Sequence, residues 1–297
     1  MTDSTVPASG GLPTRGGRRL SMNWLGALPF LAYVGMFLIL PTLLVAVGAF
    51  FNDAGHATLA NVQELGQDYV LHAFKNSLVL SAETAVAGAV LGGILTYVVA
   101  TGRPDGLLRK AVTAACGVLA QFGGVTLALA FIATVGSEGF LTALLHDALG
   151  RDVDPSFLFD LNGLALVYTY FQIPLMVLVF LPAIDGIKPQ WREAAESLGG
   201  STWDYWRHVA LPILTPPFLG ALLLLFANAF SAYATAAALI SQGAPIVPLQ
   251  IANTFSSEVL LGRENIGKAF ALGMIVIVAV VMTANSLLQR RAGRWLR

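Results

Sequence analysis

The most informative part of the chain is the stretch Glu193-Ala194-Ala195-Glu196-Ser197-Leu198-Gly199. After nine further residues it is followed by Val209-Ala210-Leu211-Pro212. It is charged and compact, whereas the sequence around it is apolar. Pro189 suits the first turn of a helix, where its missing N–H costs nothing, and the pattern predicts a helix over Trp191 to Leu198. We expect Gly199-Gly200 to end this helix.

A second helix is predicted to begin directly after the two glycines. Ser201 can cap it, because Asp204 follows three residues later at the spacing of a capping box. Pro212 marks the point where that helix must stop or bend. The pattern therefore predicts two short helices separated by a sharp break.

The spacing of these residues resembles a known signature. The pattern resembles the cytoplasmic segment of permease subunits of binding-protein-dependent ABC importers. That segment reads E-A-A-x-x-x-G, then nine further residues, then I/V-x-L-P. Two alanines make the first helix thin enough to enter a groove on another protein, where Glu193 can meet a basic group. In that family the segment is the coupling helix, which sits in a cleft of the ATPase subunit. The resemblance implies ATPase-coupling roles for Glu193, Ala194, Ala195, Leu198, Gly199, Val209, Leu211 and Pro212.

The composition of the whole chain is that of a membrane protein. Of its 297 residues, 56% are hydrophobic and only 11% are charged, which is too little charge for the surface of a soluble domain of this size. Windows of roughly 20 apolar residues, long enough to span a bilayer, predict an all-α protein with six transmembrane helices. They lie at about Trp24 to Phe51, Ser77 to Ala100, Ala111 to Val135, Leu164 to Ile184, Pro217 to Ile240 and Ala269 to Leu288.

The chain is expected to form one membrane bundle between two tails. Residues 1–20 are rich in Ser, Thr, Pro and Gly and predict a disordered cytoplasmic tail, and residues 290–297 form a basic one. Residues 21–52 resemble the peripheral first helix of the importer class. Residues 76–289, with the coupling segment 188–212, resemble its five-helix core in the type I importer fold.

Positive charges are divided unevenly between the two faces of a chain that crosses the membrane six times. The face with more Lys and Arg is expected to be cytoplasmic, so both termini and the coupling segment are predicted to lie in the cytoplasm of a bacterial inner membrane protein. The opposite face carries ten acidic residues against the basic residues Lys75, Arg151, Arg263 and Lys268. No basic patch is interleaved with aromatic residues, which argues against a nucleic-acid partner. The cytoplasmic face holds thirteen of the seventeen basic residues: Arg15, Arg18, Arg19, Arg103, Arg109, Lys110, Lys188, Arg192, Arg207, Arg290, Arg291, Arg294 and Arg297.

The sequence predicts neither a catalytic site nor a cofactor site. The stretch from Gly262 to Lys268 has the spacing of a phosphate-binding loop, but Ala269 offers no hydroxyl for magnesium and no strand is expected before it. The four histidines lie apart and Cys116 is the only cysteine, so neither a zinc site nor a disulfide within the chain is expected. The chain is therefore predicted to be no enzyme, and ATP and magnesium are expected in a partner ATPase.

Polar residues inside the apolar windows are candidates for a solute path, because a polar group that faces hydrocarbon is costly. Asn228, Ser231 and Thr235 share a face at helical spacing and are the leading candidates, with plain hydrogen bonding between helices as the alternative. Glu83 stands near the outer end of the second window, where a role in the path and a helix contact are both open. The proposed path residues are Gln121, Tyr170, Asn228, Ser231, Tyr233 and Thr235, and Tyr168 and Gln172 accompany Tyr170 in the fourth window.

These observations predict a permease subunit of an ATP-driven importer. We expect it to pair with a second permease or a copy of itself, with a cytoplasmic ATPase dimer and with an extracytoplasmic substrate-binding protein. The alternative is a secondary transporter driven by an ion gradient, which would need buried carboxylates and paired broken helices. The stretch from Phe122 to Ile132, with Gly136 and Gly139 after it, resembles permeases of the spermidine/putrescine group, which also includes importers of thiamine, ferric iron and aminoethylphosphonate. A small polar solute of the polyamine-like group is therefore the expected substrate.

Overall fold

The computed structural model describes residues 23–52, 55–103, 105–149, 155–240, 245–256 and 264–295. The expected tail over residues 1–20 lies outside these ranges. Regular structure in the described residues is helical, and Phe51 and Ala57 form an isolated antiparallel bridge. Contacts divide the chain into two units, Met1–Val45 and Ala46–Arg297.

The first unit contains most of one long apolar helix. It consists of α1 (Asn23–Val34), a π-helical turn η1 (Gly35–Ile39) and the start of α2 (Leu40–Gly48). The wide turn closes with a bond from the Leu40 N–H to the carbonyl of Gly35. Pro41, which has no N–H to donate, follows directly, and such π turns often mark an interruption of the regular ladder.

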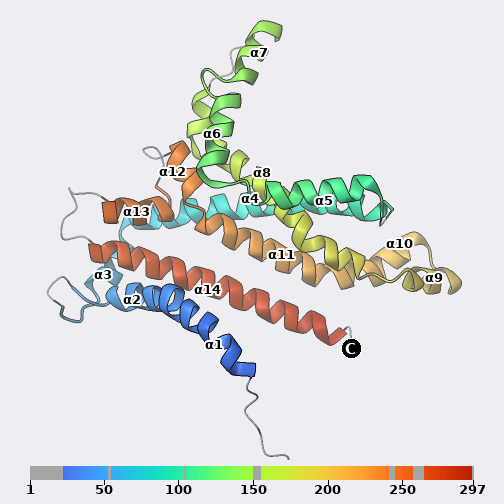
Figure 1. Ribbon diagram of the computed structural model, residues 1–297, viewed down its shortest axis with the longest axis horizontal. Helices are drawn as coiled ribbons and strands as arrows, with labels where there is room; N and C mark the ends of the chain where they lie inside the picture. Colours follow the sequence, from blue (N-terminus) through green and yellow to red (C-terminus); the bar gives the residue numbers. More distant parts are fainter. Residues whose placement is uncertain are drawn as a thin grey trace, which may run out of the picture. The chain divides into compact units, whose positions relative to one another are not determined.

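The second unit is a set of long helices with two shorter ones that project from it. In Figure 1, α4, α8, α11 and α14 run side by side, while α6 and α7 leave the bundle at a steep angle. The elements before α8 are α3 (Ala60–Gln63), η2 (Glu64–Gly66), α4 (Asp68–Thr101), α5 (Leu107–Leu119), α6 (Gly124–Val135), α7 (Phe140–Leu149) and η3 (Pro155–Phe159). They are followed by α8 (Leu161–Asp185), α9 (Pro189–Ser197), α10 (Thr202–Tyr205), η4 (Trp206–Ala210), α11 (Leu211–Ser231), α12 (Ala234–Ile240), α13 (Val247–Ser256) and α14 (Glu264–Trp295).

The prediction of an all-α protein with six membrane-spanning segments is confirmed. Among the described residues, six helical segments are long and apolar enough to cross a bilayer: Gly26–Gly48, Asp68–Thr101, Gly124–Ala148, Leu161–Asp185, Thr202–Ser231 and Ile266–Arg290. The sixth segment continues beyond its predicted end, because α14 extends to Trp295 and includes most of the expected basic tail.

Two predicted windows are not single helices. The third window, Ala111 to Val135, is divided because α5 ends at Leu119 and α6 begins only at Gly124. The fifth window, Pro217 to Ile240, is divided after Ser231. Continuous hydrophobicity does not reveal a break of this kind, since the residues on both sides of it are equally apolar.

The second unit has two main apolar cores, one on each side of these breaks. The α4–α11 core joins α4, α8 and α11, and the α6–α12 core joins α6, α12, η3 and the first half of α8. Ala85, Ala89, Met176, Phe180, Leu214, Ala221 and Leu225 form the buried part of the α4–α11 core. Leu127, Ala128, Leu158, Leu164, Tyr168, Ala236, Leu239 and Ile240 are among the buried residues of the α6–α12 core.

Candidate functional site

The first helix of the coupling segment, α9, begins at a proline and ends at a glycine. Pro189 occupies the first turn of α9. At the other end, Gly199 has a φ of +80°, a conformation that side chains other than glycine adopt at a cost. The Gly200 N–H donates to the Ala195 carbonyl at 2.9 Å and the Gly199 N–H donates to the Glu196 carbonyl at 3.0 Å. This pair of bonds is the Schellman motif, which satisfies carbonyls at the end of the helix.

The second helix starts at the predicted capping box but does not stop at the predicted proline. The Asp204 N–H donates to Ser201 Oγ at 3.2 Å, and the Ser201 N–H donates to Asp204 Oδ2 at 3.0 Å. Beyond them, α10, η4 and α11 form one continuous helix over Thr202–Ser231. The expectation of a second short helix is therefore wrong, because the π-helical turn η4 precedes Pro212 and carries the helix past it.

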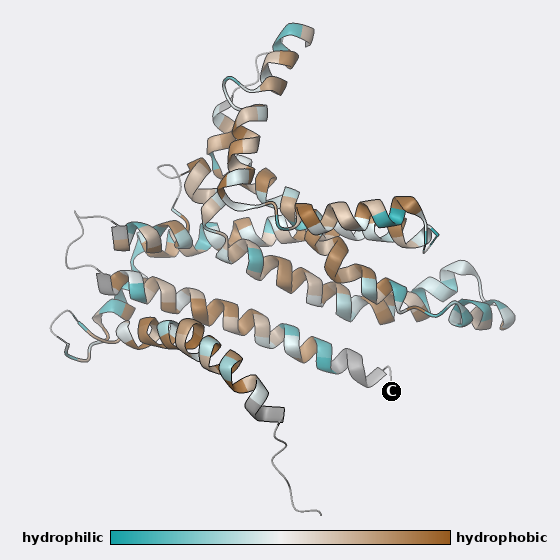
Figure 2. Ribbon diagram, in the orientation of Figure 1, coloured by the Kyte–Doolittle hydropathy of each residue, from teal (hydrophilic) through white to brown (hydrophobic). Residues whose placement is uncertain are grey.

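The coupling segment exposes apolar side chains at a polar end of the unit. Leu198 is 89% exposed and Trp203 is 66% exposed, beside the exposed carboxylate of Glu193. Figure 2 shows mostly hydrophilic residues over α9 and α10, in contrast to the hydrophobic middle of α11. Large apolar side chains within such a surface are typical of a protein-binding site. Among the predicted coupling residues, Ala195 and Val209 are half-buried, while Glu193, Ala194, Leu198, Gly199, Leu211 and Pro212 are exposed.

The base of the coupling segment is tied to the bundle by an aromatic contact and an ion pair. Trp206 packs edge-on against Tyr97 of α4, with ring centroids 5.6 Å apart. At the end of α8, just before α9, Asp185 accepts a bond from Arg109 of α5 at 2.5 Å. These contacts join the start of the helix over Thr202–Ser231 to α4, and the end of α8 to α5.

The two helix breaks lie together in space. The Thr235 hydroxyl donates to the Gly124 carbonyl at 3.2 Å, which joins the start of α12 to the start of α6. Gly124 has a φ of +68°, so the turn into α6 needs glycine. The Tyr168 hydroxyl donates to the Ala232 carbonyl at 2.6 Å and so satisfies a group that the end of α11 leaves free.

A cavity of about 270 Å³ opens between the two breaks. The hydrogen-bonding groups on its wall are neutral, and Asn228 and Tyr233 are exposed on it. Both side chains offer polar atoms to a solute. The residues that line it are Ala120, Gly123, Gly124, Phe171, Asn228, Ser231, Ala232, Tyr233, Ala234 and Thr235.

Four of the six predicted path residues line this cavity, although not for the reason expected. Thr235 belongs to α12 and not to the helix of Asn228 and Ser231, so the argument from one helical face is wrong. The break brings Thr235 to the cavity instead. Gln121 lies in the turn beside the cavity without lining it, and Tyr170 packs edge-on against Phe131 at 5.6 Å.

Tyr168 and Gln172 connect helices and do not face the cavity. Both are fully buried. Gln172 Nε2 donates to the Leu225 carbonyl at 2.9 Å, so α8 is bonded to α11 there as well as at Tyr168. Gln172 Oε1 has no hydrogen-bond partner among the described residues. Glu83 lies on the exposed face of α4 near the middle of the helix, because α4 begins well before the predicted window, and it does not line the cavity.

Phe171 and Gly124 are cavity residues that sequence reasoning did not select. The adjacent glycines Gly123 and Gly124 were the available signal for a turn in this window. No such signal marks Phe171, which is one apolar residue among many. The described residues contain no group of three or more His, Cys, Asp or Glu side chains placed to hold a metal.

Comparison with known proteins finds several transport permeases. The chain is 24% identical to the ferric transport system permease protein FbpB of Actinobacillus pleuropneumoniae over 67% of this chain, but it spans only 28% of that protein. It is 24% identical to the sulfate transport system permease protein CysW of Synechococcus elongatus, over 89% of this chain and 88% of CysW. The spermidine/putrescine transport system permease protein PotB of Haemophilus influenzae is 25% identical over 86% of this chain and 91% of PotB.

The fold is also found in a solved transporter structure. A bacterial ABC transporter involved in the import of the acidic polysaccharide alginate matches with a TM-score of 0.71 at 19% identity, over 92% of this chain and 95% of that chain. The model of the family described as binding-protein-dependent transport system inner membrane component matches residues 127–297, which is more than half of the chain. The chain therefore belongs to the family of binding-protein-dependent transport system inner membrane components.

Proposed function

We propose that this chain forms the solute path of an ATP-driven importer and is moved by a separate cytoplasmic ATPase. The observation that carries the proposal is the exposed surface of α9 and α10, with Glu193, Leu198 and Trp203, at the end of the helix that leads to the cavity. A thin helix with an exposed carboxylate and apolar side chains suits a groove on another protein.

The continuous helix over Thr202–Ser231 gives this surface a direct mechanical link to the path. At 1.5 Å per residue its thirty residues extend about 45 Å. One end carries the coupling segment, and the other end lies at the cavity beside Asn228 and Ser231. When the ATPase dimer closes on ATP, it would draw the coupling segments of two permeases together and rock α11 between inward-open and outward-open states.

The remaining subunits follow from the same proposal. A second permease or a copy of this chain completes the path, a pair of ATPase subunits holds ATP and magnesium, and an extracytoplasmic binding protein delivers the solute. Both termini lie in the cytoplasm in this arrangement, with residues 21–52 as a peripheral helix and residues 76–289 as the core. The excess of Lys and Arg on the coupling side supports that orientation.

The proposed substrate is a small polar solute of the polyamine-like group. The likeness to PotB supports a polyamine, whereas FbpB and CysW are named for ferric and sulfate transport. The acidic residues of the face opposite the coupling segment favour a cation. Calorimetry of the partner binding protein with spermidine, ferric citrate and sulfate would separate these cases, and binding of sulfate alone would contradict the polyamine assignment.

The alternative of a secondary transporter is disfavoured by the family to which the chain belongs, although the structure contains paired broken helices of the kind such transporters use. The described residues that line the cavity include no carboxylate to carry a coupling proton or sodium ion. Liposomes that contain this permease and its partner without the ATPase give the test. Solute uptake driven by an ion gradient in such liposomes would favour the secondary transporter.

Substitution of Glu193 by Lys tests the coupling assignment. We expect Glu193→Lys to leave the protein inserted in the membrane but to abolish ATP-driven uptake, because it reverses the charge offered to the ATPase groove. Proline at Ala195 should have the same effect by interrupting α9. The measurements are uptake in proteoliposomes with all subunits and recovery of the ATPase with the tagged permease.

The matched control is Asp105→Lys, which makes the same change of charge at an exposed position in the loop between α4 and α5. It should keep most of the uptake. Wild-type uptake by Glu193→Lys, or an equal loss in both variants, would show that the coupling segment is assigned to the wrong residues.

A further inference from the structure

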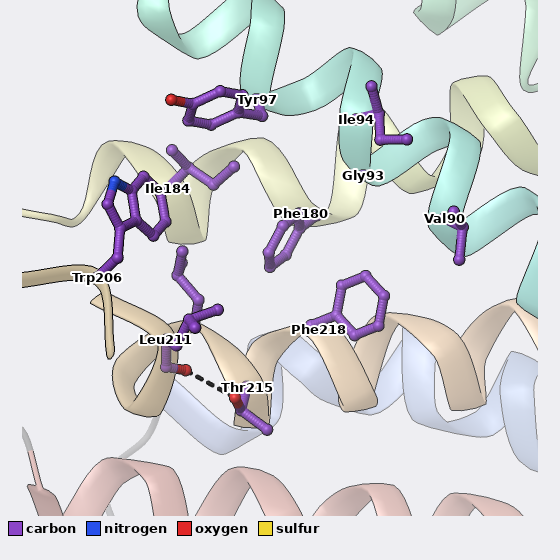
Figure 3. A pocket seen from close by; sticks show the side chains of 11 residues that line it. Val90, Gly93, Ile94, Tyr97, Phe180, Ile184, Trp206, Leu211, Thr215 and Phe218 are labelled. Carbon is purple, nitrogen blue, oxygen red and sulfur yellow. Dashed lines mark hydrogen bonds between the residues drawn. The ribbon is translucent and has the colours of Figure 1, made fainter. Parts of the chain in front are cut away.

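A larger hollow lies beside the coupling segment, between α4, α8 and the first turns of α11. Its volume is about 580 Å³, which is within the range of small-molecule sites. Figure 3 shows side chains from the three helices turned toward this space, with Val90 and Phe218 at one end and Trp206 at the other. We refer to it as the α4–α11 groove.

The lining of the groove suits hydrocarbon and not a polar solute. Phe180, Leu214 and Phe218 are among the apolar side chains that form it. Thr215 is a polar exception, and its hydroxyl already donates to the Leu211 carbonyl at 2.6 Å. A polar solute would leave its own groups without hydrogen bonds here, which is costly.

The two ends of the groove differ in chemistry. Tyr97 and Trp206 pack edge-on at the end nearest the coupling segment, and these two residue types favour the headgroup level of a bilayer. Val90 lies seven residues before Tyr97, about 10 Å along α4. The groove therefore runs from the expected membrane interface toward the hydrocarbon, which is the direction of a lipid acyl chain.

The charges near the aromatic end favour an anionic headgroup. Arg207 directly follows Trp206, and Arg103 stands two residues beyond the end of α4; both are exposed. Asp185 of this region pairs with Arg109. Asp105 and Asp204 are exposed acids that oppose Arg103 and Arg207, and the exposed Lys110 adds a third basic residue. Basic residues at the inner membrane surface attract anionic lipids.

We propose that the α4–α11 groove binds one acyl chain of an anionic phospholipid, with the headgroup near Arg103 and Arg207. Part of the groove wall belongs to the helix that carries the coupling segment, and the rest belongs to α4 and α8. A bound lipid therefore bridges the moving and the supporting helices. Lipid binding itself does not depend on the proposed function, whereas an effect of the lipid on coupling rests on it.

A photoreactive benzoylphenylalanine at Val90 tests the occupant of the groove. The full complex would be placed in nanodiscs that contain equal amounts of phosphatidylglycerol and phosphatidylcholine. We expect an adduct with the mass of one phospholipid and at least threefold more phosphatidylglycerol than phosphatidylcholine. The matched control is the same probe at Leu91, which is exposed at the same depth of α4 but on another face and outside the groove, and it should label the two lipids equally.

A cross-link from Val90 to the first helix of this chain or to another subunit would overturn the proposal, and so would equal labelling of the two lipids. The double variant Arg103→Gln with Arg207→Gln should abolish the preference for phosphatidylglycerol while total labelling at Val90 persists. An unchanged preference would also overturn it. The adduct masses need no transport activity, so this outcome is independent of the test at Glu193.

Discussion

The coupling segment and the paired helix breaks both interrupt long helices, but they are held by different kinds of contact. In the coupling segment, Gly200 bonds to Ala195 and Asp204 bonds to Ser201, so each partner lies within five residues. At the breaks, the partners of the bond from Tyr168 to Ala232 are 64 residues apart, and those of the bond from Thr235 to Gly124 are 111 residues apart. The first interruption is specified locally, whereas the second exists only when the helices are assembled.

Because the bonds are local in the coupling segment and long-range at the helix breaks, substitutions in the two regions should affect different parts of the molecule. A change in the coupling segment should alter the direction of α9 and leave both apolar cores intact. A change at the breaks should loosen the α6–α12 core and leave α9 in place. Hydrogen exchange followed by peptide can measure both regions in one sample, because it reports local opening of each region.

The largest effect after that of Glu193→Lys is expected from Gly199→Ala. A side chain on a residue with a φ of +80° destabilises this turn by about 1–2 kcal/mol. That corresponds to roughly a 5- to 30-fold lower ratio of the observed turn to other local conformations. We expect ATP-driven uptake to fall by a similar factor while thermal unfolding of the core is unchanged. Gly117→Ala is the control, since Gly117 lies within α5 with open space around it. An equal loss of uptake in Gly117→Ala would show that the effect of Gly199→Ala does not come from the positive φ of Gly199.

A comparable free-energy cost, but in the other region, is expected from Tyr168→Phe. The substitution keeps the ring and removes the hydroxyl, so the partly buried Ala232 carbonyl loses its partner at a cost of about 1–3 kcal/mol. Hydrogen exchange should rise in α6 and α12 and stay unchanged in α9. Tyr170→Phe is the matched control, because Tyr170 is 38% exposed. Unchanged exchange in α12 would show that this bond does not hold the break.

The smallest effect is expected from Ser201→Ala. Loss of a helix N-cap costs about 0.5–2 kcal/mol, but the continuous helix over Thr202–Ser231 should persist because the rest of it packs in the bundle. We expect faster exchange only over residues 202–206 and a modest loss of uptake. In the control Ser197→Ala, the lost hydroxyl bonds within α9 to the Glu193 carbonyl, so the exchange of residues 202–206 should not change. Faster exchange at the breaks in Ser201→Ala would contradict the local character of the coupling segment.

Sequence reasoning worked best where a residue acts on its near neighbours. Pro189, Gly199 and the pair Ser201 and Asp204 have the roles that their order along the chain predicts. It was wrong about a second short helix, because the π-helical turn before Pro212 interrupts the regular ladder without ending the helix, which continues to Ser231. It also failed for Thr235, whose neighbours at the cavity come from another helix.

The amino-acid sequence by itself determined that the chain is a helical membrane protein with six spans and a capped, glycine-broken segment over residues 188–212. Hydrophobic length, helix caps and glycine conformation act over a few residues, so they can be read in order along the chain. Only the tertiary structure decided that α5 and α11 stop at the same level and that a polar cavity opens there. The bonds that fix these breaks join residues far apart in sequence, and both sides of each break are apolar, so hydrophobicity does not reveal them. Gly123 and Gly124 mark the turn of the first break, but they do not show which residues it meets.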